Sequence, residues 1–104
     1  MTAYVLTAAA ESDLRDIVKY TRRQWGDAQT RRYIATLEQG IASLVDGRGV
    51  FKDMSAFFPA LRMGRYEHHY VFCLPRDGEV ALIVAIFHER MDLMTRLAGR
   101  LEQD

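Results

Sequence analysis

Residues 80–87 constrain the fold of this chain more than any other stretch, because all eight are apolar and most are β-branched or aromatic. A strand turns successive side chains to opposite faces. With strict alternation, the two faces would carry Val80, Leu82, Val84 and Ile86, and Ala81, Ile83, Ala85 and Phe87. Strands that are apolar on both faces are normally covered on both faces. The sequence therefore predicts a small sheet between two layers, in a chain too short to supply both layers without a partner.

A second strand, at residues 70–74, precedes this one and is joined to it by Pro75-Arg76-Asp77-Gly78. Proline fixes φ at the start of a turn, and Asp-Gly tolerates positive φ. The two strands and their turn predict an antiparallel hairpin. Beyond it, Asp92 is a candidate N-cap for a C-terminal helix. The apolar residues at helical spacing in that helix are Met91, Met94, Leu97, Ala98 and Leu101.

The first half of the chain predicts a short strand at residues 3–6, followed by two helices. Thr7 is a candidate N-cap, and Gly26 interrupts the helical pattern. The apolar stripes are Leu14, Ile17, Val18, Thr21 and Trp25 on the first helix, and Ile34, Leu37, Ile41, Leu44 and Val45 on the second. Gly40 in mid-helix costs about 1 kcal/mol relative to alanine. We expect the close approach of a neighbouring helix to explain it.

Residues 48–60 predict a loop with three phenylalanines, and residues 61–66 a further strand. The order is β-α-α-β-β-β-α, which predicts an α+β fold in a single domain spanning residues 1–104. An N-terminal strand and a helical hairpin precede a three-stranded antiparallel sheet and a C-terminal helix.

Composition excludes several classes of function. With 14 basic and 14 acidic residues the formal net charge is zero, which argues against an affinity that depends on neutralising many phosphates, although local patches remain open. The single cysteine, Cys73, cannot form an internal disulfide and is expected to be a small buried residue. No metal-ligand spacing, signal peptide or membrane-spanning run is present. We expect a cytoplasmic protein with no cofactor, no bound metal and no membrane association.

The most reactive cluster of residues lies at predicted strand ends: Arg62, Arg65, His88, Glu89 and Arg90. If the strands pair as predicted, these side chains converge near one sheet surface. Histidine transfers protons near neutral pH and arginine stabilises phosphoryl charge, which is the equipment of a metal-free ribonuclease. Solvated strand-end charges are the alternative interpretation. His68 and His69 are adjacent on a strand, so the two rings are expected to point to opposite faces.

Four segments resemble the ParE toxins of bacterial type II toxin–antitoxin pairs, within the RelE/ParE superfamily, and together they span nearly the whole chain. They are LTAAAESDLRDIVKYTRRQWG, RRYIATLEQGIASL, FKDMSAFFPALR and HHYVFCLPRDGEVALIVAIFHERMDLMTRL. The resemblance implies a toxin that poisons DNA gyrase, blocks replication and supports plasmid maintenance by killing plasmid-free daughter cells. It also implies neutralisation by a ParD-type antitoxin, which would supply the sequence-specific DNA contacts of the complex; no direct sequence-specific DNA binding by this chain is expected.

The same superfamily contains ribosome-dependent mRNA endonucleases of the RelE type, which are the alternative. These enzymes have a strongly basic surface and a C-terminal tyrosine or His–Tyr pair, whereas here Glu89 follows His88. A carboxylate beside a scissile phosphate is repelled. We therefore expect no catalytic residue and no enzyme activity; a non-toxic binding module is a third possibility. The candidate surface for target or antitoxin is Arg62, Arg65, His88, Glu89, Arg90, Met91, Met94 and Leu97.

Overall fold

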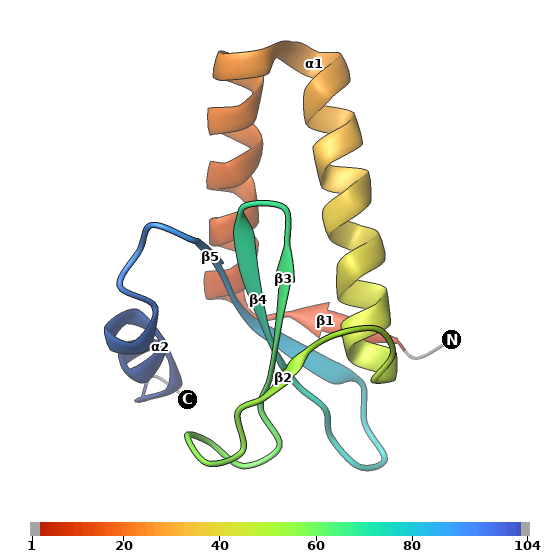
Figure 1. The fold of residues 1–104 in the computed structure, drawn as a ribbon, viewed down its shortest axis with the longest axis vertical. Coiled ribbons are helices and arrows are strands. Elements are labelled where there is room, and N and C mark those ends of the chain that lie inside the picture. Colours follow the sequence, from red (N-terminus) through yellow and green to blue (C-terminus); the bar gives the residue numbers. More distant parts are fainter. Residues whose placement is uncertain (1–2, 103–104) are drawn as a thin grey trace.

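The computed structural model describes residues 3–102 as one mixed sheet between two helical layers (Figure 1). The elements are β1 (Tyr4–Leu6), α1 (Ala8–Asp46), β2 (Lys52–Asp53), β3 (Arg62–Tyr66), β4 (His69–Leu74), β5 (Ala81–His88) and α2 (Leu93–Glu102). The sheet order is β1-β5-β4-β3-β2, with β1 parallel to β5 and the other pairs antiparallel. The α+β prediction is confirmed. No described helix has the length and apolarity needed to cross a membrane.

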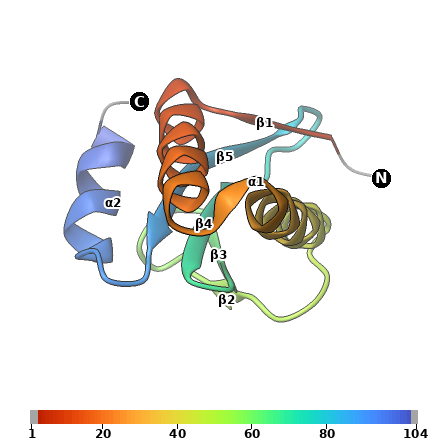
Figure 2. The same cartoon turned by 90° about the horizontal axis from the view of Figure 1, so that it is seen from above.

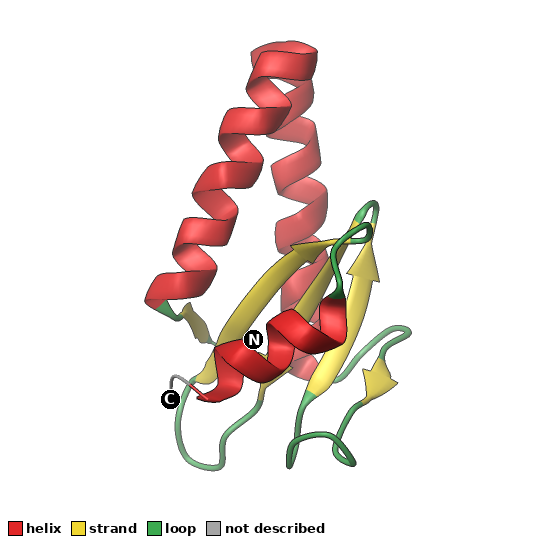
Figure 3. Ribbon diagram, turned by 90° about the vertical axis from the view of Figure 1, so that its left-hand side faces the viewer, coloured by secondary structure: helices red, strands yellow, loops and turns green. Residues whose placement is uncertain are grey.

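Helix α1 is the predicted helical hairpin. Gly26 alone has non-helical angles within it, with φ 84° and ψ 175°, an extended conformation with positive φ that glycine adopts without strain. The two arms, residues 8–25 and 27–46, lie side by side in Figures 1 and 3. The predicted N-cap is confirmed, because the Thr7 hydroxyl accepts a hydrogen bond from the Ala10 amide at 3.1 Å. The second arm ends at Gly47, which is left-handed, with φ 71°.

The sheet contains more pairing than the sequence predicted. Strand β2 lies inside the predicted loop, and β1 joins the three central strands at their far edge. Strand β2 consists of Lys52 and Asp53, and two residues carry too little local propensity to predict a strand from sequence. They form one because they pair with Met63 and Arg62 of β3. The single thiol, Cys73, is fully buried in β4, as expected, and burial raises its pKa to about 11.

A β-bulge in β5 corrects the predicted faces of this strand. Phe72 pairs with Ala85 but Cys73 pairs with Ile83, so Val84 is an extra residue without a partner position. A bulge of one residue reverses the alternation beyond it. Ile86 therefore joins Ile83 on the side of α1. The opposite side receives Leu82, Val84, Ala85 and Phe87.

Helix α2 covers the second face of the sheet, opposite the helical hairpin (Figures 2 and 3). It begins after Asp92, whose carboxylate accepts from the Thr95 hydroxyl at 2.9 Å. Leu93, Leu97 and Leu101 pack on the cluster around Phe72, and Leu97 is fully buried. The prediction that the chain is too short to cover both faces was wrong, because ten residues of helix suffice for the second layer of so narrow a sheet.

Gly40 is explained by an aromatic ring and not by a neighbouring helix. A Cβ atom at Gly40 would overlap with the ring of Tyr66 in β3, and one at Gly64 would overlap with its hydroxyl end. Tyr66 thus lies flat between the second arm of α1 and its own strand. The expectation that Gly40 lies against a neighbouring helix was wrong: the missing side chain at Gly40 lets the sheet approach the helix.

A partly buried ion pair connects all three layers. Arg100 of α2 donates to both carboxylate oxygens of Asp13 in α1, at 2.9 and 3.1 Å, and to the Val84 carbonyl at 2.9 Å. Asp13 also accepts from the Ile86 amide at 3.0 Å. These Val84 and Ile86 groups lie at and just beyond the bulge. The ion pair thus supplies partners for polar backbone groups at this irregular point of β5.

We predict that Asp13→Ala lowers the free energy of unfolding by about 3 kcal/mol, because it leaves the Arg100 guanidinium without a countercharge and the Ile86 amide without an acceptor. Both side chains are less than one-fifth exposed (17% and 18%). Urea denaturation measures the change. Asp16→Ala, an exposed carboxylate one turn away, is the matched control and should change stability by no more than about 0.5 kcal/mol. Equal effects of the two substitutions would contradict this role of Asp13.

Candidate functional site

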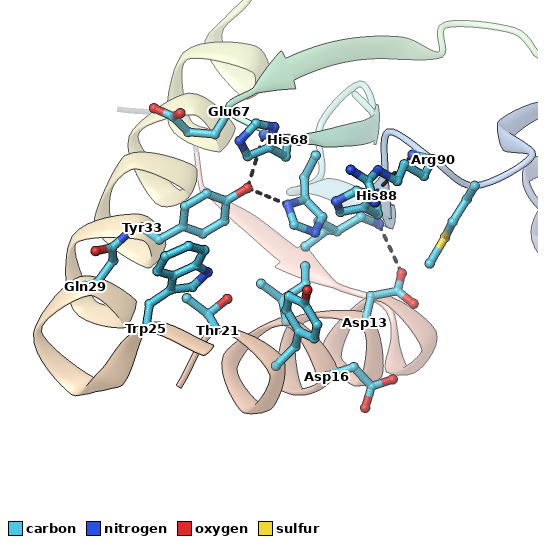
Figure 4. A pocket seen from close by; sticks show the side chains of 15 residues that line it. Asp13, Asp16, Thr21, Trp25, Gln29, Tyr33, Glu67, His68, His88 and Arg90 are labelled. Carbon is cyan, nitrogen blue, oxygen red and sulfur yellow. Dashed lines mark hydrogen bonds between the residues drawn. The ribbon is translucent and has the colours of Figure 1, made fainter. Parts of the chain in front are cut away.

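A cavity of about 570 Å³ lies where the helical hairpin passes over the end of β4 and β5 (Figure 4). The first arm of α1 contributes Ile17, Tyr20 and Trp25, and the second arm contributes Tyr33. The sheet side carries all three histidines, and the segment after β5 adds Arg90 and Met91. Tyr20 and Trp25 are 64% and 63% exposed, so the aromatic wall is open to solvent on one side.

Three imidazoles meet at the sheet side of this cavity. His69 pairs directly with His88 across the β4–β5 ladder, and their ring centroids are 5.2 Å apart at an interplanar angle of 89°. The His68 ring stacks with the His88 ring at 6.5 Å. The expected divergence of the His68 and His69 rings was wrong: both rings contact the His88 ring and line the cavity, because His68 lies in the turn before β4 and does not follow the alternation of the strand. Among residues 3–102, no group of three or more ligand side chains is arranged to hold a metal ion.

Tyr33 fixes the buried histidine from the helical side. Its hydroxyl lies 2.6 Å from Nδ1 of His69 and accepts a hydrogen bond from the His68 amide at 3.2 Å (Figure 4). Burial, and next the nearby His88 and His68, lower the pKa of His69 to about 4. The imidazole of His69 is therefore neutral at pH 7 and serves to hold β4 against α1.

Glu89 interacts with two neighbouring polar side chains at the end of β5. Its carboxylate accepts from the Arg65 guanidinium at 2.5 Å and lies 2.7 Å from Nδ1 of His68. The hydrogen bond from His68 and the charge of Arg65 hold the pKa of Glu89 below its usual range. Arg65 also stacks on the Tyr70 ring at 5.7 Å. The guanidinium of Arg65 is thus already paired with a carboxylate in the free protein.

The predicted cluster is only partly assembled. Arg65, His88, Glu89 and Arg90 lie at one end of the sheet, where the Arg90 amide donates to Nδ1 of His88 at 3.1 Å. Arg62 is three residues from Arg65 and therefore faces the other side, at the far end of β3. Its guanidinium donates to the Leu44 and Val45 carbonyls at 3.0 and 3.2 Å and stacks on Phe51.

The remaining residues of the predicted binding surface differ in solvent exposure. Met91 and Met94 are 39% and 45% exposed, whereas Leu97 is fully buried. The lining residues that were not among the predicted site candidates include Tyr20, Trp25, Tyr33 and His69. The helical stripe assigned Trp25 to the core, but the first arm extends beyond the sheet at this point. Only the crossing of α1 over the strand ends brings these side chains together.

Comparison with known proteins identifies the family. The family model for the "ParE toxin of type II toxin-antitoxin system, parDE" matches residues 4–93. This chain belongs to the ParE toxin family. A toxin ParE from Escherichia coli is 76% identical over 102 residues, which cover 98% of this chain and 99% of that protein. The fold of the ParE-family chain also matches a chain of a chromosomal ParDE toxin–antitoxin system from P. aeruginosa, with a TM-score of 0.66 over 85% and 96% of the two chains, at 17% identity.

We predict that stability falls by about 2–3 kcal/mol between pH 7 and pH 4.5 through His69 alone. Its pKa is about 4 in the folded chain and about 6.5 when unfolded, so the unfolded state takes up a proton first. This contribution is fully present above the unfolded pKa and is lost as the pH falls towards 4. Urea denaturation of the wild type and His69→Gln at both pH values isolates the effect, since other acidic groups titrate in both proteins. Identical pH dependence would contradict it.

Proposed function

We propose that this ParE-family toxin binds and poisons DNA gyrase without catalysis of its own, and that a ParD-type antitoxin neutralises it. The consequence would be blocked replication and the killing of daughter cells that lose the toxin–antitoxin genes, which maintains a plasmid. Family membership over nearly the whole chain supports this proposal. A toxin that acts by binding needs a shaped surface and no proton transfer.

The pairing of Glu89 is the observation that favours binding over RNA cleavage. In a metal-free ribonuclease an arginine must be available to the scissile phosphate. Here the Arg65 guanidinium is held by Glu89 at 2.5 Å, and the carboxylate would repel a phosphate at the same position. The δ nitrogen of His88 already accepts from the Arg90 amide. The superfamily's ribonuclease mechanism is therefore the weaker candidate for this site.

For the antitoxin we propose a docking surface formed by the exposed residues after β5, namely Arg90, Met91 and Met94, beside the aromatic wall of the cavity. Methionine side chains adapt to different partners because they are unbranched and polarizable. Arg90 is exposed and could pair with an acidic antitoxin segment. Arg62 and Leu97 belonged to the predicted surface, but in this conformation they hold the end of α1 and the second core.

We predict that the purified chain inhibits supercoiling by purified gyrase and accumulates cleaved DNA in the same reaction. Plasmid topology and linear DNA on agarose gels measure both effects. A ribosome-dependent mRNA cleavage assay run in parallel should show no cuts. Codon-dependent cuts in translated mRNA, with supercoiling untouched, would overturn the proposal.

The His88→Ala variant serves as the mechanistic control in both assays. Loss of a general acid or base typically costs about 10²–10⁴-fold in rate. If gyrase binding is the activity, folded His88→Ala should retain its effect on supercoiling. Abolished toxicity in a folded variant would instead favour catalysis.

We predict that Met91→Glu combined with Met94→Glu weakens antitoxin binding by at least about tenfold, since it replaces adaptable apolar contacts with charges that an acidic segment repels. Isothermal titration of the toxin with a peptide from the cognate antitoxin measures the affinity. Val50→Glu combined with Val80→Glu is the matched control, because both valines are exposed but adjoin the other end of the sheet, Val80 just before β5 and Val50 two residues before β2. Equal weakening by the two pairs would contradict the proposed surface.

A further inference from the structure

The turn of the helical hairpin concentrates positive charge on a neutral protein. Residues 19–32 contain five basic side chains and one acidic side chain, Asp27, so the segment carries +4 and the remainder of the chain −4. The five are Lys19, Arg22, Arg23, Arg31 and Arg32. Figures 1 and 3 show this part of α1 extending beyond the strands, away from the sheet and α2. We call this surface the basic tip.

The fold does not use these charges. All five side chains are on exposed residues, and Arg22 pairs with Asp27 at 3.0 Å. Within residues 3–102, no carboxylate lies within 4.0 Å of the other four cations. Self-repulsion at the basic tip is therefore a cost to folding that stability alone does not explain.

We propose that the basic tip binds the phosphate backbone of double-stranded DNA without sequence preference. A DNA duplex presents one negative charge per about 1.7 Å of its axis, and neutralising phosphates releases condensed counterions. Exposed arginines on two adjacent helical arms match such a row of charges. The inference does not depend on gyrase as the target, since it rests on the charge and shape of the basic tip.

A peptide or protein partner fits this surface less well than DNA does. A peptide that orders on binding must bury apolar area to offset its lost entropy. The large apolar side chains of residues 19–32 are Tyr20 and Trp25, and both line the cavity on the sheet side (Figure 4). Apart from these two aromatic residues, which are exposed beside the cavity, residues 19–32 expose mainly the five basic side chains, two glutamines and Asp27. The basic side chains suit phosphate contacts. Such contacts position a protein on DNA but carry no sequence information.

Fluorescence anisotropy of the full chain with a labelled mixed-sequence duplex of about 20 base pairs, at salt concentrations from about 50 to 200 mM, tests the proposal. We expect binding that weakens as salt rises. Arg31→Gln combined with Arg32→Gln should lower the affinity about tenfold at the lowest salt and reduce the log–log salt slope by about 2. Arg48→Gln combined with Arg96→Gln removes the same charge from exposed positions outside the basic tip and should change binding little.

Three results would overturn the proposal: no binding by the wild type at the lowest salt, equal losses in the two double variants, or Arg31- and Arg32-dependent binding of poly-glutamate in preference to DNA. The last would assign the basic tip to an acidic protein. Thermal melts establish that each variant is folded. Should the Arg31, Arg32 pair fail to fold, Lys19→Gln combined with Arg23→Gln on the first arm carries the same expectation. Gyrase inhibition measured on the same proteins separates a failure of DNA binding from a failure of the proposed target.

Discussion

The carboxylate of Asp13 forms the hydrogen bonds on which the rest of the structure depends. It lies in the first arm of α1, receives two hydrogen bonds from Arg100 of α2, and accepts the Ile86 amide of the strand between them. One side chain thus joins both helical layers to the sheet. A buried charge pair is specific because it tolerates little displacement, and removing one partner leaves the other uncompensated. The two layers are held in one relative position by this network as well as by apolar packing.

The same network determines the geometry of the candidate site. Arg100 and Asp13 satisfy the Val84 carbonyl and the Ile86 amide, which lie at and just beyond the β-bulge. Beyond the bulge the alternation of β5 is reversed, so His88 faces the helical hairpin together with Ile86. Strict alternation would have placed His88 on the side of α2, away from His69. The cavity of the three histidines therefore exists because one extra residue is accommodated in the strand.

Charge is distributed unevenly over this ParE-family chain, and the distribution separates three regions. At the strand ends, Glu89 pairs with Arg65 and His68, so that region is internally compensated. The exposed methionines after β5 offer an adaptable apolar surface. The basic tip at the hairpin turn is uncompensated. A protein of zero net charge can thus combine the proposed antitoxin surface with the proposed phosphate-binding surface, because screening in water weakens interactions between exposed charges more than about 8 Å apart.

The sequence by itself determined the local structure: the caps at Thr7 and Asp92, the break at Gly26, the helical stripes and the central hairpin follow from short-range preferences. These features led to the correct fold class and to a cluster at the strand ends, Arg65, His88, Glu89 and Arg90, of which His88 and Arg90 line the cavity. Tertiary structure alone decided the rest. The bulge in β5, the short strand β2 and the assembly of the cavity each depend on contacts between segments far apart in the chain. An alternating pattern of apolar residues along a strand cannot reveal an inserted residue. The spacing of side chains along one helix likewise cannot show which side chains of a distant strand will lie against that helix.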